Sequence, residues 1–470
     1  MFLKTGLNFL KQHFLFILLL ILLGIYGYFL FYHIGHRAYI DWDESIYAQI
    51  SKEALLNHNY LSFTFWGNHW FEKPPLMFWL TIIGYKAFGI NELGARIFVP
   101  IFAFGTIVLT LALVKKISRS LLAVTLTAAS FGVCYQFFFH SFFLEFDIPV
   151  TFFVLLSIYG FLLALEKPKF FYLFFGALGL AVLTKSVIGL LPLPILFIYL
   201  IISRQFSKLK NRHFAWGIGL AAAIILPWHI WETIQFGKSF WNSYLYYHVI
   251  DRYTKPLENN GGPFNFYFPI LWQNTVFEIL LALSSGYFLI QSCKKNFNYF
   301  LLLLCAVFIF LFFSAAKTKG YGYIVVVYPF ILAMFGITLS DLLNKSSSKI
   351  LKNFAILILL LVFLGLGWQE QNYKILKLEN SADSVYYDEN RSIAKFIQKK
   401  YPNKPVYGES WVEANLSFSY YLGKPVPVLA KDSPVGRNLP PDYFSKPGYR
   451  VFHQMRRSVY DFGEYLYIAP

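Results

Sequence analysis

FFYLFFGALGLAVLTKSVIGLLPLPILFIYLII, residues 170–202, contains a single charged residue, Lys185, near its middle. A helix needs roughly 20 apolar residues to cross a bilayer, and shorter helices are tolerated, so this stretch is long enough for two short crossings. Lys167 and Lys169 precede it and Arg204 follows it. Basic residues mark the cytoplasmic ends of membrane helices, and two flanks on one side require an even number of crossings. The stretch therefore predicts a helical hairpin with Lys185 at its far turn.

Apolar runs of this kind recur along the whole chain and are separated by short charged loops. They predict an all-α polytopic membrane protein of about 11 transmembrane helices. The predicted helices start near Phe14, Leu93, Leu121, Ile148, Phe170, Val187, Phe214, Thr275, Tyr299, Tyr323 and Ile350.

The composition supports a membrane protein and excludes a nucleic-acid partner. The chain is 57% hydrophobic and 14% charged, whereas a soluble domain is about 25% charged. The net charge of +16 comes mainly from Lys and Arg beside apolar runs, where such residues fix topology. The three cysteines have no metal-ligand spacing, and no disulfide framework is predicted.

The sign of the loop charges predicts the orientation. Loops rich in Lys and Arg, including the N-terminus, alternate with loops rich in Asp and Glu. The basic loops are expected in the cytoplasm and the acidic loops outside. The N-terminal apolar run has no small-residue cleavage motif, so we expect it to remain as the first helix.

A change in composition near Trp368 predicts a second domain. Residues 1–368 form the predicted transmembrane domain, with a first outer loop at 33–92, and residues 369–470 form a small extracytoplasmic α/β domain. Ile393, Phe396 and Ile397 have the spacing of an amphipathic helix. No internal repeat is evident, which argues against an inverted-repeat transporter.

Carboxylates gather in the outer loops. Asp43 and Glu44 lie in the first outer loop with Glu72, and Glu145 and Asp147 precede the helix that starts near Ile148. Acids at a membrane boundary can act as a general base or bind a divalent metal. The alternative is ordinary helix-start chemistry, since Asp is a good N-cap and Pro is common in a first turn.

Several cations also lie on the predicted outer side, where topology predicts few. They are Lys185, His248 and Arg252, and Lys317 and Lys319 in a turn that ends at Tyr321. Cations beside carboxylates suggest a phosphate-bearing substrate. For any one of these cations considered alone, a structural role is more common than a role in binding phosphate.

The motifs together resemble a known family over residues 14–368. In order, they are Asp43-Glu44-Ser45-Ile46-Tyr47-Ala48, Phe71-Glu72-Lys73-Pro74-Pro75-Leu76, Asp147-Ile148-Pro149, Leu183-Thr184-Lys185, Pro227-Trp228 and Tyr328-Pro329. This series resembles the bacterial GT-C fold membrane glycosyltransferases related to protein O-mannosyltransferases and lipid A aminoarabinose transferases. The chain departs from the aminoarabinose transferases in having Ile46 where they carry Arg.

The resemblance implies a sugar donor linked to polyprenyl phosphate, an extracytoplasmic acceptor and a location in the bacterial inner membrane. It implies that Asp43 is the catalytic base and that Glu44 and Asp147 support it, hold the acceptor or bind a metal. A divalent cation, Mg²⁺ or Mn²⁺, would be held by Asp43 and Asp147. The donor phosphate would be held by Lys73, Lys185, Arg252, Lys317 and Lys319. Glu72, Glu145, His248 and Tyr321 are the remaining candidates for substrate binding.

The predicted reaction is one displacement that inverts the anomeric centre. The acceptor is a protein hydroxyl, a lipid A phosphate or a surface polysaccharide.

A flippase for lipid-linked sugars is the alternative in another class, and it predicts ionisable residues spread along the helices. Their concentration on one face favours the enzyme. A third alternative makes residues 370–470 a binding module and the rest its anchor, but about 11 helices exceed what anchoring needs.

Overall fold

The computed structural model describes residues 2–32, 34–40, 42–271, 284–291, 294, 297–345, 382–408, 416–426, 449–454, 457–461 and 466–469. The chain divides into two compact units. The first, here called the membrane unit, comprises Met1–His33, Phe71–Leu80 and Ile97–Tyr373. The second, here called the loop unit, comprises Ile34–Trp70, Thr81–Arg96 and Lys374–Pro470.

Long apolar helices dominate the described residues and confirm the predicted all-α membrane fold. Seven are long and apolar enough to cross a bilayer: His13–Tyr32, Glu92–Ser118, Asp147–Ala164, Pro168–Leu190, Arg212–Phe236, Phe297–Ala315 and Tyr321–Asn344. Three shorter apolar helices cover Leu76–Phe88, Leu121–Phe131 and Pro192–Ser203. Leu76–Phe88 falls in the predicted first outer loop and was not expected as an apolar helix. The starts predicted near Thr275 and Ile350 lie outside the described residues.

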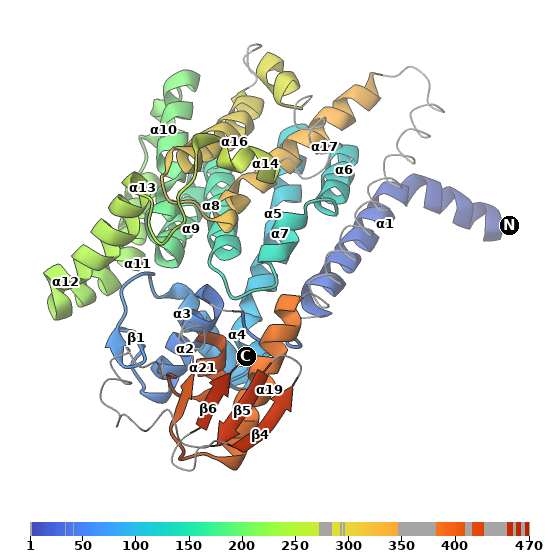
Figure 1. Cartoon of the computed structure of the whole chain (residues 1–470). Helices are drawn as coiled ribbons and strands as arrows, with labels where there is room; N and C mark the ends of the chain where they lie inside the picture. Colours follow the sequence, from blue (N-terminus) through green and yellow to red (C-terminus); the bar gives the residue numbers. More distant parts are fainter. Residues whose placement is uncertain are drawn as a thin grey trace. The chain divides into compact units, whose positions relative to one another are not determined.

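The helices of the membrane unit follow the predicted order (Figure 1). The longer ones are α1 (Phe2–Tyr32), α5 (Phe98–Ser118), α6 (Leu121–Phe131), α8 (Asp147–Ala164), α9 (Phe171–Lys185), α10 (Pro192–Ser203), α11 (Arg212–Phe236), α16 (Phe297–Ala315) and α17 (Tyr328–Asn344). The shorter ones are α7 (Tyr135–His140), α12 (Lys238–Trp241), α13 (Arg252–Thr254) and α14 (Tyr267–Leu271). Short 3-10 helices cover Pro168–Phe170, Ser186–Leu190, Phe206–Leu209, Phe264–Phe266 and Tyr321–Val327, and a π-helix covers Asn242–Asp251.

Small residues let the helices of this unit approach closely. A Cβ on Gly336 of α17 would lie 1.9 Å from Thr127 Oγ1 and 2.7 Å from the Ala123 carbonyl oxygen of α6. A Cβ on Gly217 of α11 would lie 2.4 Å from the ring of Phe175 in α9. Inside a membrane, where apolar burial between helices gains little, such close packing is a main source of helix association.

The predicted break at Lys185 is confirmed. Helix α9 ends at Lys185, a 3-10 turn covers Ser186–Leu190, and α10 starts at Pro192. Ser186 has a φ of 49°, which few non-glycine residues adopt. Proline is common in a first helical turn because its missing N–H has no helical partner there. The Lys185 side chain is thus presented from the end of a helix rather than from its middle.

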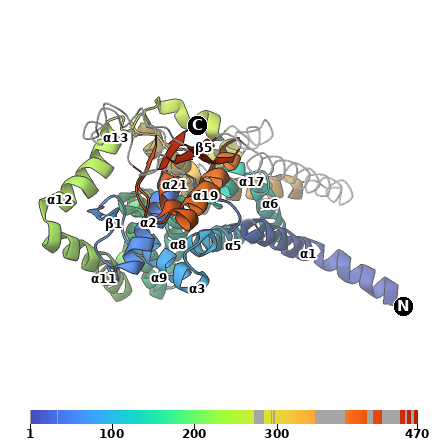
Figure 2. The same cartoon turned by 60° about the horizontal axis from the view of Figure 1, so that its bottom comes forward.

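The loop unit combines helices with two small sheets. Its elements are α2 (Asp43–Leu56), β1 (Thr64–Phe65), β2 (Asn68–His69), the end of α3 (Leu76–Phe88), α4 (Glu92–Arg96), α19 (Ala382–Lys400), β3 (Val406–Gly408), α21 (Leu416–Leu422), β4 (Tyr449–Gln454), β5 (Arg457–Asp461) and β6 (Leu466–Ala469). The larger sheet has the order β3-β6-β5-β4, with β3 parallel to β6 and the other pairs antiparallel. Helix α19 contacts β4 of this sheet and α21 (Figure 2). Ile393 and Ile397 are buried, as expected for the inner face of an amphipathic helix.

The division into units differs from the predicted domains. The C-terminal residues form one unit with residues 34–70 and 81–96 of the first outer loop. The Tyr39 amide donates to the Tyr421 hydroxyl at 2.9 Å, and that hydroxyl donates to Glu92 at 2.7 Å. Arg391 also pairs with Glu92 at 3.1 Å. A change in composition along the chain does not reveal such pairing between distant polar segments.

Candidate functional site

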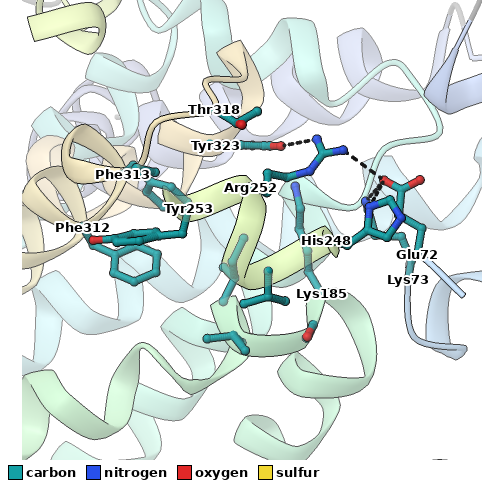
Figure 3. A pocket seen from close by; sticks show the side chains of 15 residues that line it. Glu72, Lys73, Lys185, His248, Arg252, Tyr253, Phe312, Phe313, Thr318 and Tyr323 are labelled. Carbon is teal, nitrogen blue, oxygen red and sulfur yellow. Dashed lines mark hydrogen bonds and ion pairs between the residues drawn. The ribbon is translucent and has the colours of Figure 1, made fainter. Parts of the chain in front are cut away.

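A pocket in the membrane unit gathers most of the predicted cations (Figure 3). Its empty volume is about 680 Å³, including the part open to solvent. The lining residues are Glu72, Lys73, Lys185, Ser186, Val187, Ile188, His248, Val249, Arg252, Tyr253, Phe312, Phe313, Ala316, Thr318 and Tyr323. Charged groups and an apolar wall therefore face the same space.

Local structure explains how the cations reach the pocket. Lys73 lies just before α3, Lys185 is the last residue of α9, and Arg252 is the first residue of α13. The segment before Arg252, Asn242–Asp251, is a π-helix and carries His248. π-helical turns are rare and are frequent at functional sites. Figure 3 shows Lys185, His248 and Arg252 converging on one region.

Lys185 forms a buried ion pair with Asp147. Its Nζ lies 2.6 Å from Asp147 Oδ1 and 4.7 Å from the centre of the Tyr323 ring. Asp147 is the first residue of α8, and Pro149 lies in the same first turn. The predicted helix start is thus confirmed, but the carboxylate also neutralises a lysine. Charges within a membrane protein usually pair in this way.

Glu145 has a partner that the sequence did not predict. Its Oε2 lies 2.5 Å from Nδ1 of His140, which is buried. Burial lowers the pKa of His140, but Glu145 and then Asp147 outweigh this effect and raise the pKa overall. His140 Nε2 is buried without a hydrogen bond to any described residue. The only signal in the sequence was a histidine five positions before Glu145.

Arg252 and Glu72 form a network of polar contacts on one side of the pocket. Arg252 donates from one nitrogen to the Tyr323 hydroxyl at 3.2 Å, and another nitrogen lies 4.0 Å from Glu72. Glu72 also pairs with Lys73 and lies 3.7 Å from His248 Nδ1. Burial opposes ionisation of Glu72, but Lys73, His248 and Arg252 together lower its pKa to about 2. Glu72 therefore stays ionised at neutral pH.

His248 lines the pocket as a neutral group. Burial lowers its pKa to about 4, although Glu72 acts in the opposite direction. At neutral pH its imidazole is therefore uncharged and can donate one hydrogen bond and accept another. The fixed positive charges of the pocket are Lys73, Lys185 and Arg252, which the sequence had selected.

The turn after α16 contributes other residues than those predicted. Lys317 is exposed, and Tyr321 is 62% exposed. Lys319 Nζ donates to the carbonyls of Phe313 and Ser314 at 3.1 and 2.7 Å, so it stabilises the turn. None of the three lines the pocket, whereas Thr318 and Tyr323 do. The sequence thus indicates the correct segment but not which of its side chains face the pocket.

Asp43 and Glu44 lie in the loop unit and differ in their surroundings. Asp43 is the exposed first residue of α2 and follows Trp42, whose φ of 65° is rare for a bulky residue. Glu44 is buried and accepts from Arg96 at 2.7 and 2.8 Å and from the Ile40 amide at 2.9 Å. Glu44 therefore neutralises the buried Arg96, and the catalytic roles of Asp43 and Glu44 stay predictions.

A divalent cation stays a prediction as well. Within the described parts of the chain, no three His, Cys, Asp or Glu side chains form a group that could hold a metal ion. Asp147 is paired with Lys185, which already supplies the positive charge that a metal would. No step of the reaction proposed below is routed through a metal.

The chain is similar to known glycosyltransferases in sequence. A family model described as dolichyl-phosphate-mannose-protein mannosyltransferase matches residues 72–231. The undecaprenyl phosphate-alpha-4-amino-4-deoxy-L-arabinose arabinosyl transferase 1 of Pseudomonas fluorescens strain Pf-5 is 30% identical over 56% of this chain. That match spans 48% of the relative, so the alignment covers about half the length of such relatives. A protein of Aquifex aeolicus without an assigned activity is 27% identical over 83% of this chain and 75% of its own length.

Solved structures show the same fold. ArnT from Cupriavidus metallidurans bound to undecaprenyl phosphate superposes with a TM-score of 0.76 and 18% identity, covering 94% of this chain and 97% of that one. The Archaeoglobus fulgidus oligosaccharyltransferase superposes with a TM-score of 0.58 and 13% identity, covering 89% and 64%. The fold and the relationship predicted from the motifs are both confirmed. The chain therefore has the GT-C fold, and its sequence is similar to those of the protein mannosyltransferases and the aminoarabinose transferases.

Proposed function

We propose that this protein transfers a sugar from a polyprenyl-phosphate donor to an acceptor on the extracytoplasmic face of the bacterial inner membrane. The observation that carries the proposal is a pocket in which Lys73, Lys185 and Arg252 face the same space as an apolar wall. A polyprenyl phosphate has the matching chemistry, because its anionic head is joined to a long hydrocarbon chain. In this proposal the N-terminus is cytoplasmic and the loop unit is extracytoplasmic.

The cations suit the phosphate. Arg252 presents a planar fork that matches phosphate geometry, and Lys73 and Lys185 act as point charges. Asp147 and Glu72 offset part of this charge in the free protein. These carboxylates keep the pocket cations paired in the free protein, and the oxygens of a bound phosphate would add to that pairing.

The apolar wall suits the lipid. Val187 and Ile188 come from the turn after α9, Val249 from the π-helix, and Phe312 and Phe313 from α16. Apolar side chains beside a charged head group would exclude water and strengthen its electrostatic contacts. The structure of ArnT from Cupriavidus metallidurans, bound to undecaprenyl phosphate, supports a ligand of this class.

The proposed reaction is a single displacement at the anomeric carbon. The acceptor oxygen forms a bond to that carbon as the bond from the carbon to the phosphate oxygen breaks, which inverts the configuration. Asp43 takes the acceptor proton and later releases it to solvent. Lys73, Lys185 and Arg252 stabilise the charge that develops on the departing phosphate. Because phosphate leaves readily, no covalent enzyme intermediate is needed.

The direct test of the pocket is binding of undecaprenyl phosphate to the purified protein in lipid nanodiscs. Arg252→Gln is expected to weaken binding by about 10–100-fold, because one hydrogen bond to a charged group contributes about 1.5–3 kcal/mol. Lys317→Gln is the matched control, since Lys317 is exposed and does not line the pocket. Equal binding by wild type and Arg252→Gln would exclude this pocket as the phosphate site.

Gly322→Ala is expected to lower the rate of sugar transfer by about tenfold, because a shift of Asp147 would move Lys185, which it pairs with and which is proposed to stabilise the departing phosphate. The added Cβ would lie 3.1 Å from Asp147 Cγ and 3.2 Å from His140 Cε1, so both side chains would have to shift. Gly24→Ala is the control, because no atom lies within 4 Å of its Cβ position. An unchanged rate for Gly322→Ala would show that the position of Asp147 does not limit transfer.

A further inference from the structure

Glu258 pairs with one terminal nitrogen of Arg252 in the free protein. Both of its carboxylate oxygens accept hydrogen bonds of 2.8 Å from Nη2 of Arg252. The Tyr247 hydroxyl lies 3.4 Å from the same carboxylate. Glu258 does not line the pocket, and its side chain is 44% exposed. An exposed acid thus binds one of the proposed phosphate-binding groups.

The backbone around Glu258 is strained. Glu258 and Asn259 have φ values of 55° and 57°, in the left-handed region, which asparagine adopts readily and glutamate rarely. The following turn is fixed, because the Lys319 amide donates to the Asn260 carbonyl at 2.6 Å. A residue in a costly conformation persists only while other contacts hold it there. For Glu258, the contact with Arg252 is such a contact, so losing it favours release of the side chain.

Resting on the function proposed above, we propose that Glu258 is an internal competitor for the lipid phosphate and promotes release of the product. When phosphate binds Arg252, the carboxylate of Glu258 is displaced and its strained turn can relax. When the carboxylate returns, it takes the guanidinium back and lowers the affinity for the departing lipid. No bond is made or broken in this exchange, and only ion pairs are exchanged.

The charge of the product explains why such a competitor is useful. The sugar-linked donor is a phosphodiester with one negative charge. The released polyprenyl phosphate is a monoester with a charge of about −1.5 to −2 at pH 7. Three fixed cations therefore hold the product more tightly than the donor, and product inhibition would follow. A carboxylate that competes for Arg252 reduces this difference.

Glu72 is less suited to this role. It is less exposed than Glu258, paired with Lys73 and 4.0 Å from Arg252, so its movement would leave a lysine without its carboxylate. Glu258 is half-exposed and its release would place the carboxylate in water, where the cost is small. Of the two described acids that pair with Arg252, Glu258 is therefore the one that can exchange with phosphate.

The test compares Glu258→Gln with wild type in lipid nanodiscs, using undecaprenyl phosphate as the probe. Glu258→Gln is expected to bind the probe about two- to fivefold more tightly, the size expected for a half-exposed ion pair. Its transfer reaction should be inhibited by undecaprenyl phosphate at correspondingly lower concentrations. Asp251→Asn is the matched control, because Asp251 is an acid of the same segment that pairs with Lys255 at 2.8 Å. It should leave both quantities unchanged.

The outcomes separate the two proposals. Equal or weaker binding by Glu258→Gln, with normal binding by wild type, would overturn the role of Glu258 and leave the proposed function intact. Equal tightening by Asp251→Asn would also overturn it, because net charge rather than competition would then explain the effect. If wild type does not bind undecaprenyl phosphate at all, the proposed function fails and the inference fails with it.

Discussion

Asp43→Asn is expected to lower the rate of sugar transfer by about 10²–10⁴-fold, the usual contribution of a general base. Asparagine has nearly the same shape as aspartate but cannot take up the acceptor proton. The measurement is transfer by the purified protein in lipid vesicles at saturating donor. Binding of undecaprenyl phosphate should be unchanged, since the proposed phosphate ligands lie elsewhere in the sequence.

A stability effect must be separated from this loss of rate. Asp43 is exposed at the first residue of α2, where a negative charge stabilises a helix by about 0.3–1 kcal/mol. The variant should therefore remain folded and keep its binding of undecaprenyl phosphate. Glu166→Gln is the control, because Glu166 is another exposed acid and pairs with Lys116 on the predicted cytoplasmic side. Full activity of Asp43→Asn would assign the base to another residue.

Glu44→Ala is expected to destabilise the protein by about 3–5 kcal/mol, the cost of leaving a buried charge without its partner. Arg96 is 1% exposed and donates all of its hydrogen bonds within the loop unit. Two go to Glu44, and the others go to the carbonyls of Ile34, Arg37 and Ala38. Without Glu44, the guanidinium would keep the backbone carbonyls and the Tyr39 ring as neighbours but would lose the carboxylate that neutralises it.

Thermal denaturation of the detergent-solubilised protein measures this effect. A clear fall in the midpoint is expected for Glu44→Ala. Glu166→Ala removes an acid from a pair in which Glu166 is 63% exposed, and exposed pairs contribute about 0–1 kcal/mol. A midpoint for Glu44→Ala equal to that of Glu166→Ala would show that the Arg96 cluster does not stabilise the fold. It would also reopen a catalytic role for Glu44.

Much of the membrane unit was predictable because the bilayer imposes strong constraints on sequence. One lysine in a long apolar stretch predicted the break at Lys185. Lys185 and Arg252 were candidates because they are cations on the predicted outer side, where topology predicts few. Lys73 was a candidate because it belongs to the Glu72-Lys73-Pro74 motif. These three residues line one pocket. A charge that topology does not explain is thus an informative signal in a membrane protein.

The remaining features depend on contacts between distant segments, and a pattern along one chain does not encode them. Nothing in the sequence distinguishes Tyr323 from the other tyrosines, of which the chain has 33 in all. Its place in the pocket becomes evident from its contact with Arg252. Glu44 looked like a partner of Asp43, but Arg96 engages it from 52 positions away. The joining of the C-terminal residues to the first outer loop has the same origin, since Tyr39 and Tyr421 are 382 positions apart.

Mass spectrometry of envelope glycoconjugates and polyprenyl phosphates is the most direct test of the proposed function. Cells lacking the gene would be compared with cells that carry wild type or Asp43→Asn. The proposal predicts that one glycoform of lipid A, protein or polysaccharide disappears, that its polyprenyl-linked donor accumulates, and that only wild type restores both. This result would also name the acceptor. Unchanged glycoconjugates in cells that normally express the protein would contradict the proposal and favour a transporter.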